Sequence, residues 1–139
     1  MAHPHRTAIK DMLERLDRRQ ALLQEKCAEN LVESNGLSPT VASALTRRWT
    51  EAVLALKNLD DPAWETAAAR FGAWCAGQSI PFEAVMALLH FYKRSAMPLL
   101  IREYPGVEGF LEGVLALDEA VALLLGKIPG GYYAAAEIG

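Results

Sequence analysis

Residues 79–106 read SIPFEAVMALLHFYKRSAMPLLIREYPG, and this stretch decides the fold. Its Ser-Ile-Pro start is typical of a helix N-terminus, because Pro is tolerated in the first turn, where no amide donor is needed. Apolar residues then recur at spacings of three and four, which places them on one face of a helix. Pro98 should kink this helix, but the pattern stays in phase on both sides. We therefore expect one bent helix over residues 80–103, ended by Tyr104-Pro105-Gly106.

Similar start and stop signals for helices divide the rest of the chain. Ser38-Pro39 and Asp61-Pro62 each predict a helix start with a capping side chain and an early Pro. Asn35-Gly36 and Pro129-Gly130-Gly131 should each end a helix. The expected helices cover residues 7–35, 38–56, 62–76, 80–103 and 107–127. Residues 1–6 are expected to form a frayed tail, and the Ala-rich residues 132–139 could begin a further helix.

The composition favours helices throughout. The 139 residues include 23 Ala and 20 Leu, both strong helix formers, but only 17 β-branched Val, Ile and Thr residues. The length fits one domain with a core of its own. We predict a single all-α domain over residues 1–139, built as a compact five-helix, globin-like bundle without a sheet.

Charge and cysteine content exclude several classes of protein. Fourteen basic residues against 17 acidic ones give a net charge of −3, which predicts no nucleic-acid binding. Cys27 and Cys75 have neither a disulfide-framework nor a metal-binding spacing. No apolar run approaches the roughly 20 residues needed to span a bilayer, and the N-terminus lacks a signal peptide's apolar segment. The expected location is the cytoplasm.

No catalytic constellation is visible in the sequence. There is no Gly-x-Ser-x-Gly motif, no phosphate-binding loop and no Glu-x-x-His or His-Glu-x-x-His pair. Carboxylate pairs such as Asp60 and Asp61 fall at helix starts, where they complement the helix dipole. We expect no enzyme activity, no catalytic residue, no metal site and no cofactor.

His90 is the one internal histidine, and it raises the alternative of a haem sensor. In a globin-like stack the haem ligand belongs on the helix before the penultimate one, here residues 62–76, which contains no His. A structural or interface histidine is therefore the favoured interpretation. The alternative is a haem-binding globin-type sensor that uses His90 as ligand.

The last helix has an apolar stripe that we expect to face the core, made of Val107, Phe110, Leu111, Val114, Leu117, Val121, Leu124 and Leu125. Asp118 stands at the edge of this stripe. If this carboxylate is buried it needs a partner, and His90, Lys93 or Arg94 of the preceding antiparallel helix could reach it. The other interpretation is a boundary residue in contact with water. The sequence leaves the two open.

Residues 68–104 resemble the N-terminal sensor domains of RsbR stressosome proteins. The likeness lies in Gly77, Ser79 and Glu83 around a helix boundary, and in Lys93-Arg94 near the middle of the long helix that follows. A Leu117-Asp118 step and a trailing Tyr132 or Tyr133 continue it, so that it covers roughly residues 38–133. The resemblance implies a globin-like domain without haem, a homodimer through the last two helices, and a signal-input role. It also implies an output domain or partner protein at the C-terminal end.

The chain is 52% hydrophobic, which is more than five short-looped helices need for one core. The surplus is densest in residues 84–100 and 110–125, so these helices should meet a second neighbour. The candidate dimer-interface and signalling residues are Met86, His90, Lys93, Arg94, Met97, Val114, Asp118, Val121 and Leu125. A small apolar ligand is the other candidate partner, in a cavity lined by Trp49, Phe71, Trp74 and Tyr92.

Overall fold

The computed structural model describes residues 5–138, and these residues are helical except for short connections. They contain no strand, so the predicted all-α bundle is confirmed. The α-helices are α1 (Arg6–Leu16), α2 (Gln20–Asn35), α3 (Pro39–Ala55), α4 (Ala63–Gly77), α5 (Phe82–Glu103), α6 (Gly106–Leu125) and α7 (Ile128–Ile138). Two 3₁₀ turns, η1 (Asp17–Arg19) and η2 (Leu56–Asn58), join neighbouring helices.

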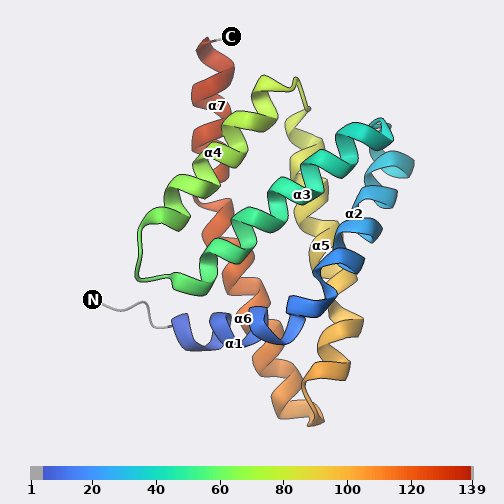
Figure 1. Ribbon diagram of the computed structural model, residues 1–139, viewed down its shortest axis with the longest axis vertical. Helices are drawn as coiled ribbons and strands as arrows, with labels where there is room; N and C mark the ends of the chain where they lie inside the picture. The colour runs from blue at the N-terminus through green and yellow to red at the C-terminus, as the bar shows by residue number, and fades with distance from the viewer. Residues whose placement is uncertain (1–4, 139) are drawn as a thin grey trace.

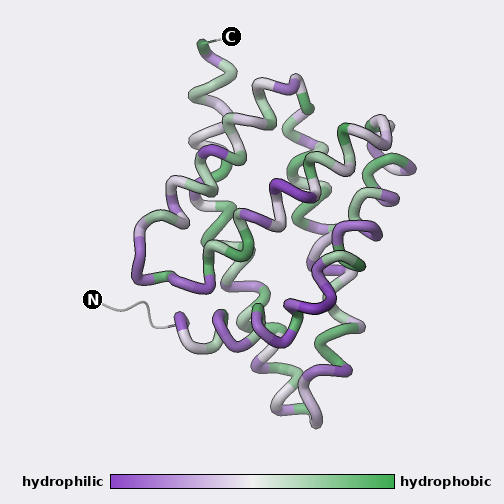
Figure 2. Tube along the Cα trace, in the orientation of Figure 1, coloured by the Kyte–Doolittle hydropathy of each residue, from purple (hydrophilic) through white to green (hydrophobic). Residues whose placement is uncertain are grey.

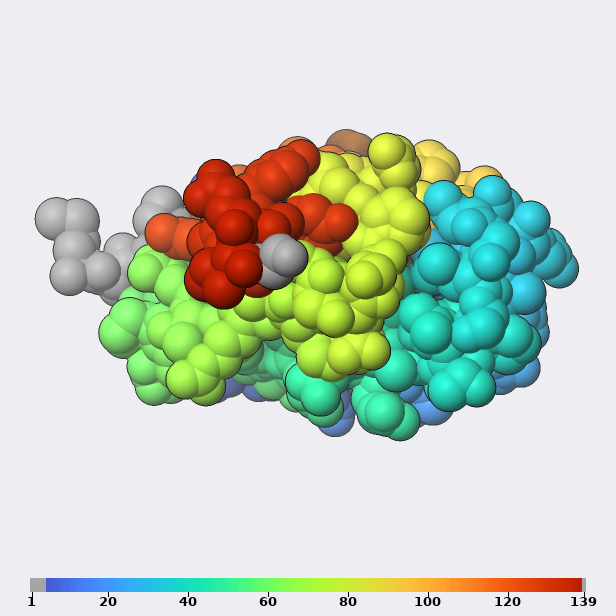
Figure 3. Space-filling view, turned by 90° about the horizontal axis from the view of Figure 1, so that it is seen from above, coloured from blue at the N-terminus to red at the C-terminus, as the bar shows by residue number. Residues whose placement is uncertain are grey.

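The helices form two layers. In Figure 1, α1, α3 and α4 pass in front of α5, α6 and α7. In Figure 3, seen from above, the red of α7 and the yellow to orange of α5 and α6 lie toward the upper edge, and the green of α3 and α4 toward the lower edge. The antiparallel pair α5 and α6 therefore has one side against the front layer and one side turned away from it.

Most of the predicted boundaries hold. Ser38 caps α3, since its hydroxyl oxygen accepts from the amide of Val41 at 3.2 Å, and Pro39 follows at the first position. Helix α5 is continuous through Pro98 and ends before Tyr104, as expected. Gly106 begins α6 at a φ of +80°, a left-handed conformation that favours glycine.

The first predicted helix is wrong in its length. Residues 7–35 form two α-helices separated by η1, because the stretch Asp17-Arg18-Arg19 offers no apolar residue to the core. Polar contacts hold the bend: Asp17 pairs with Lys57 at 3.0 Å, and Arg18 pairs with Glu103 at 3.3 Å. The N-terminal boundary also differs, since α1 begins at Arg6 and residues 1–4 of the expected tail lie outside the described part.

The expected stop at Pro129-Gly130-Gly131 is also wrong. Helix α6 ends at Leu125, and all three residues belong to α7, with Pro129 in its first turn. Gly131 is needed for close contact with α4 rather than to end a helix. A Cβ on Gly131 would overlap the carbonyl oxygen of Ala69 in α4, and one on Gly72 of α4 would overlap that of Ile128. Two glycines thus let the backbones of α4 and α7 touch.

The core lies between the two layers and is filled by large side chains. Trp49 of α3 is at its centre, with its ring 5.4 Å from that of Tyr92 and 5.9 Å from that of Phe71. Cys27 and Cys75 are buried there, and burial raises the pKa of both thiols to about 12. Figure 2 shows apolar residues (green) along α5 and α6, whereas the connection between α3 and α4 is hydrophilic.

Within residues 5–138, no helix combines the length and the apolar run that crossing a bilayer would require.

Candidate interaction surface on helices α5 and α6

The orientation of α5 is set by Tyr92, which points into the core. Its hydroxyl lies 3.4 Å from the side-chain nitrogen of the buried Gln20, which donates to it, and burial raises the pKa of the phenol to about 12. A residue two positions away on a helix points to nearly the opposite side. His90 is accordingly exposed on the outer side of α5.

Three further candidates share that outer side of α5. Met86, Lys93 and Met97 follow at helical spacings around His90, and all three are partly buried. One turn further on, Ile101 is 63% exposed. The outer side of α5 is therefore mostly apolar, with His90 and Lys93 as its polar members.

Asp118 and Lys93 join the outer sides of the two helices. The ammonium of Lys93 lies 2.9 Å from the Asp118 carboxylate, and both side chains are about half exposed. Asp118 is thus the boundary residue in contact with water, and Lys93 is its partner. Arg94 turns toward α2 instead, where its guanidinium donates to the side-chain oxygen of Asn30 at 3.2 Å.

Helix α6 buries small and large residues together on its core side and leaves other large apolar residues exposed. Gly113, Ala116 and Ala120 are buried, and a Cβ on Gly113 would lie 2.7 Å from the ring of Tyr104. Leu117, Val121 and Leu124 are buried beside them, as the apolar stripe predicted, but two members near the start of that stripe are exposed. These two are Val107 and Leu111, so the expectation that they face the core is wrong.

An apolar row follows the outer side of α6. Val107, Leu111 and Leu115 stand four residues apart, and 76%, 52% and 67% of their surfaces are exposed. Leu125 continues the exposed side at the far end of the helix. We define the α5–α6 face as the outward residues of both helices: Met86, His90, Lys93, Met97, Ile101, Val107, Leu111, Val114, Leu115, Asp118 and Leu125.

Most of the interface residues predicted from the sequence lie on this face. Two do not: Arg94 is drawn toward α2, and Val121 is buried in the core. The sequence interpretation missed Ile101, Val107, Leu111 and Leu115 as surface residues. The spacing of four between the α6 residues is visible in the sequence. The predicted core side of α6, however, left out the Gly and Ala positions that are buried.

Among the residues of the haem and apolar-ligand alternatives, Phe71 borders a pocket of about 220 Å³, whose other lining residues include three charged side chains. A haem ligand lies in an apolar pocket, whereas the imidazole of His90 is exposed. Phe71 and Tyr92 both pack against the ring of Trp49. Trp74 is partly buried, with the Arg48 guanidinium 4.8 Å from the centre of its ring. Within the described residues, no group of three His, Cys, Asp or Glu side chains is placed to hold a metal ion.

Comparisons with protein-family models, with curated proteins and with solved structures found no match for this chain. The resemblance to stressosome sensor domains therefore stays a prediction from the sequence.

Proposed function

We propose that this chain is a non-enzymatic signal-input domain that forms a homodimer through the α5–α6 face. The observation that carries the proposal is the exposed row Val107, Leu111 and Leu115. Small residues, Gly113, Ala116 and Ala120, fill part of the core side of the same helix, while these three larger apolar side chains stay outside. That orientation is costly for a monomer and useful for an interface.

Burial energetics favour an apolar partner on this face. Fully burying a Val or Leu side chain contributes about 1.5–3 kcal/mol relative to leaving it exposed. Three such side chains on α6, together with Ile101 at the end of α5, offer a binding free energy that this chain alone does not use. Most symmetric dimers place one such patch against its own copy.

The charges of the face suit a two-fold contact. A patch that meets its own copy must not bring like charges together. Lys93 and Asp118 stand side by side, so the centre of the face has no net charge. In a two-fold arrangement the Lys93 of each copy can approach the Asp118 of the other.

The signal-input role rests on the resemblance to stressosome sensor domains and on the path from the face to the chain end. Helix α6 carries the apolar row and leads directly into α7, which packs against α4 through Gly72 and Gly131. Ile138 at the end of α7 is exposed. A change in how two copies pack at α6 would thus reach the C-terminal helix, where an output domain or partner protein would attach.

The test compares two exposed leucines. Leu111→Glu places a charge on the α5–α6 face, and Leu22→Glu places the same charge on α2, where Leu22 is 38% exposed. Light scattering after size exclusion gives the mass of each variant, and circular dichroism checks that both are folded. We expect dimers of the unaltered chain and of Leu22→Glu, and monomers of Leu111→Glu. A 15.2 kDa monomer for the unaltered chain at all concentrations, or equal masses for both variants, would refute the proposal.

A further inference from the structure

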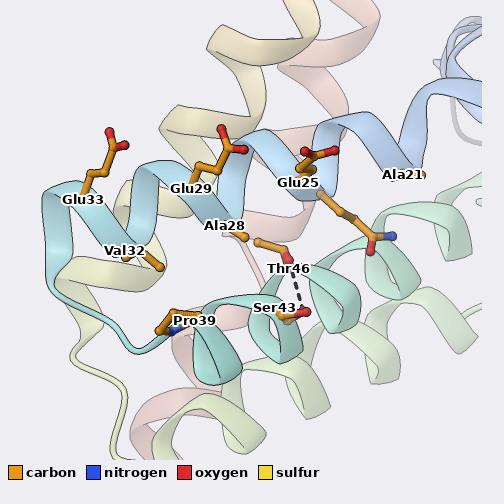
Figure 4. A pocket seen from close by; sticks show the side chains of 10 residues that line it. Ala21, Glu25, Ala28, Glu29, Val32, Glu33, Pro39, Ser43 and Thr46 are labelled. Carbon is orange, nitrogen blue, oxygen red and sulfur yellow. Dashed lines mark hydrogen bonds between the residues drawn. The ribbon is translucent and has the colours of Figure 1, made fainter.

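A second surface feature lies away from the α5–α6 face, between α2 and α3. It is a groove of about 560 Å³, shown in Figure 4. The floor is formed by small or apolar side chains, among them Ala21, Ala28, Val32 and Pro39. Ser43 and Thr46 stand on the α3 side, and the Thr46 hydroxyl donates to the carbonyl oxygen of Ser43 at 3.1 Å, so its donor is already used.

Three glutamates border the groove along α2. Glu25, Glu29 and Glu33 are exposed, stand four residues apart, and form a single row in Figure 4. None of them forms a salt bridge with another residue of the described part of the chain. The groove therefore has an apolar floor and a rim of unneutralised carboxylates on one side.

This row is unfavourable for α2 itself. Like charges four residues apart on a helix repel each other. Negative charge near a helix C-terminus also opposes the helix dipole, and the last turn of α2 carries Glu33 but no basic residue. No salt bridge within the described residues offsets this repulsion, and a positively charged partner would reduce it.

We propose that the α2–α3 groove is a docking site for a basic amphipathic helix of a partner protein. The apolar face of such a helix would lie on the groove floor, and its Lys or Arg residues would meet Glu25, Glu29 and Glu33. Residues four apart rise by about 6 Å along either helix, so a basic residue at every fourth position matches the carboxylate row. Charge complementarity selects this occupant over a second copy, because the chain is acidic overall.

The experiment measures binding of a fluorescein-labelled, 18-residue peptide to the full chain by anisotropy. The peptide has Leu and Ala on one helical face and Lys at every fourth position along its edge. Two control peptides carry Glu in place of Lys, or the same residues reordered so that no apolar face forms. The test variant is Glu25→Gln/Glu29→Gln/Glu33→Gln. Its control, Glu51→Gln/Glu108→Gln/Glu112→Gln, removes three exposed glutamates outside the groove.

We expect the basic amphipathic peptide to bind, and the groove variant to weaken its affinity at least tenfold. The control variant and Leu111→Glu should bind it as the unaltered chain does, which separates this site from the α5–α6 face. Three results would overturn the proposal. These are no binding of the peptide, equal binding of the reordered peptide, or equal losses in both triple variants. A groove variant that changed the mass of the protein and not peptide affinity would assign the groove to a second copy instead.

Discussion

Two adjacent glycines of α7 should respond to alanine with opposite signs. A Cβ on Gly130 would meet nothing within 4 Å, whereas one on Gly131 would overlap the backbone carbonyl of Ala69 in α4. Both residues are helical, so the local effect of the substitution is the same at both. The difference between the variants therefore measures the close contact of α4 and α7 alone.

The size of the effect follows from two opposed contributions. Replacing Gly by Ala inside a helix stabilises by about 0.5–1 kcal/mol, and Gly130→Ala should gain this amount. Overpacking costs about 1–3 kcal/mol, and the upper part of that range applies at Gly131 because the obstructing atom is backbone and cannot rotate away. After the helix gain is subtracted, Gly131→Ala should lose about 1–2 kcal/mol.

Urea denaturation monitored by circular dichroism gives both free energies of unfolding, provided that the m-values agree. Gly72→Ala serves as a second case, since its Cβ would overlap the carbonyl oxygen of Ile128 from the other side of the contact. It should destabilise as Gly131→Ala does. Equal changes for Gly130→Ala and Gly131→Ala would show that α7 is not held against α4 in this way.

Three further effects follow from the structure. Burial raises the pKa of Cys27 and Cys75 from 9.0 to about 12, so the contribution of these thiols to the free energy of unfolding should be constant below pH 9 and fall as pH rises toward 12. Urea titrations at about pH 8 and about pH 10 should show a smaller fall for Cys27→Ala/Cys75→Ala, and an unchanged fall would contradict the burial of the thiols. Tyr132→Phe removes a hydroxyl that donates to the Ile80 carbonyl at 2.6 Å and should cost about 1 kcal/mol, whereas the exposed Tyr133→Phe should cost little. Glu29→Gln should raise the melting temperature through a gain of about 0.3–0.5 kcal/mol in low salt, and an equal gain in about 1 M salt would argue against charge repulsion.

Local signals in the sequence predicted most helix boundaries. Ser38-Pro39 and Tyr104-Pro105-Gly106 act through capping and backbone geometry, which depend on a few neighbouring residues. Pro129-Gly130-Gly131 has the same appearance but a different cause. Gly131 is required by its close contact with α4, about 60 positions earlier in the chain, and the sequence alone does not reveal that contact.

The candidate interaction surface was partly predictable. Helical spacing placed Met86, His90, Lys93 and Met97 on one side of α5, and the structure agrees. On α6 we expected the large apolar residues of the stripe to be buried, and Leu111 is exposed instead. Which side of an apolar helix faces the core depends on how closely its neighbours approach, and that is decided by packing at positions such as Gly113.

The most direct test of dimerisation through the α5–α6 face is an isotope-filtered NOE experiment. A sample that mixes ¹³C-labelled and unlabelled chains reports only contacts between copies. We predict intermolecular NOEs from the methyl groups of Met97, Leu111 and Val114. Their absence, or NOEs from Val32 in the α2–α3 groove instead, would contradict the account.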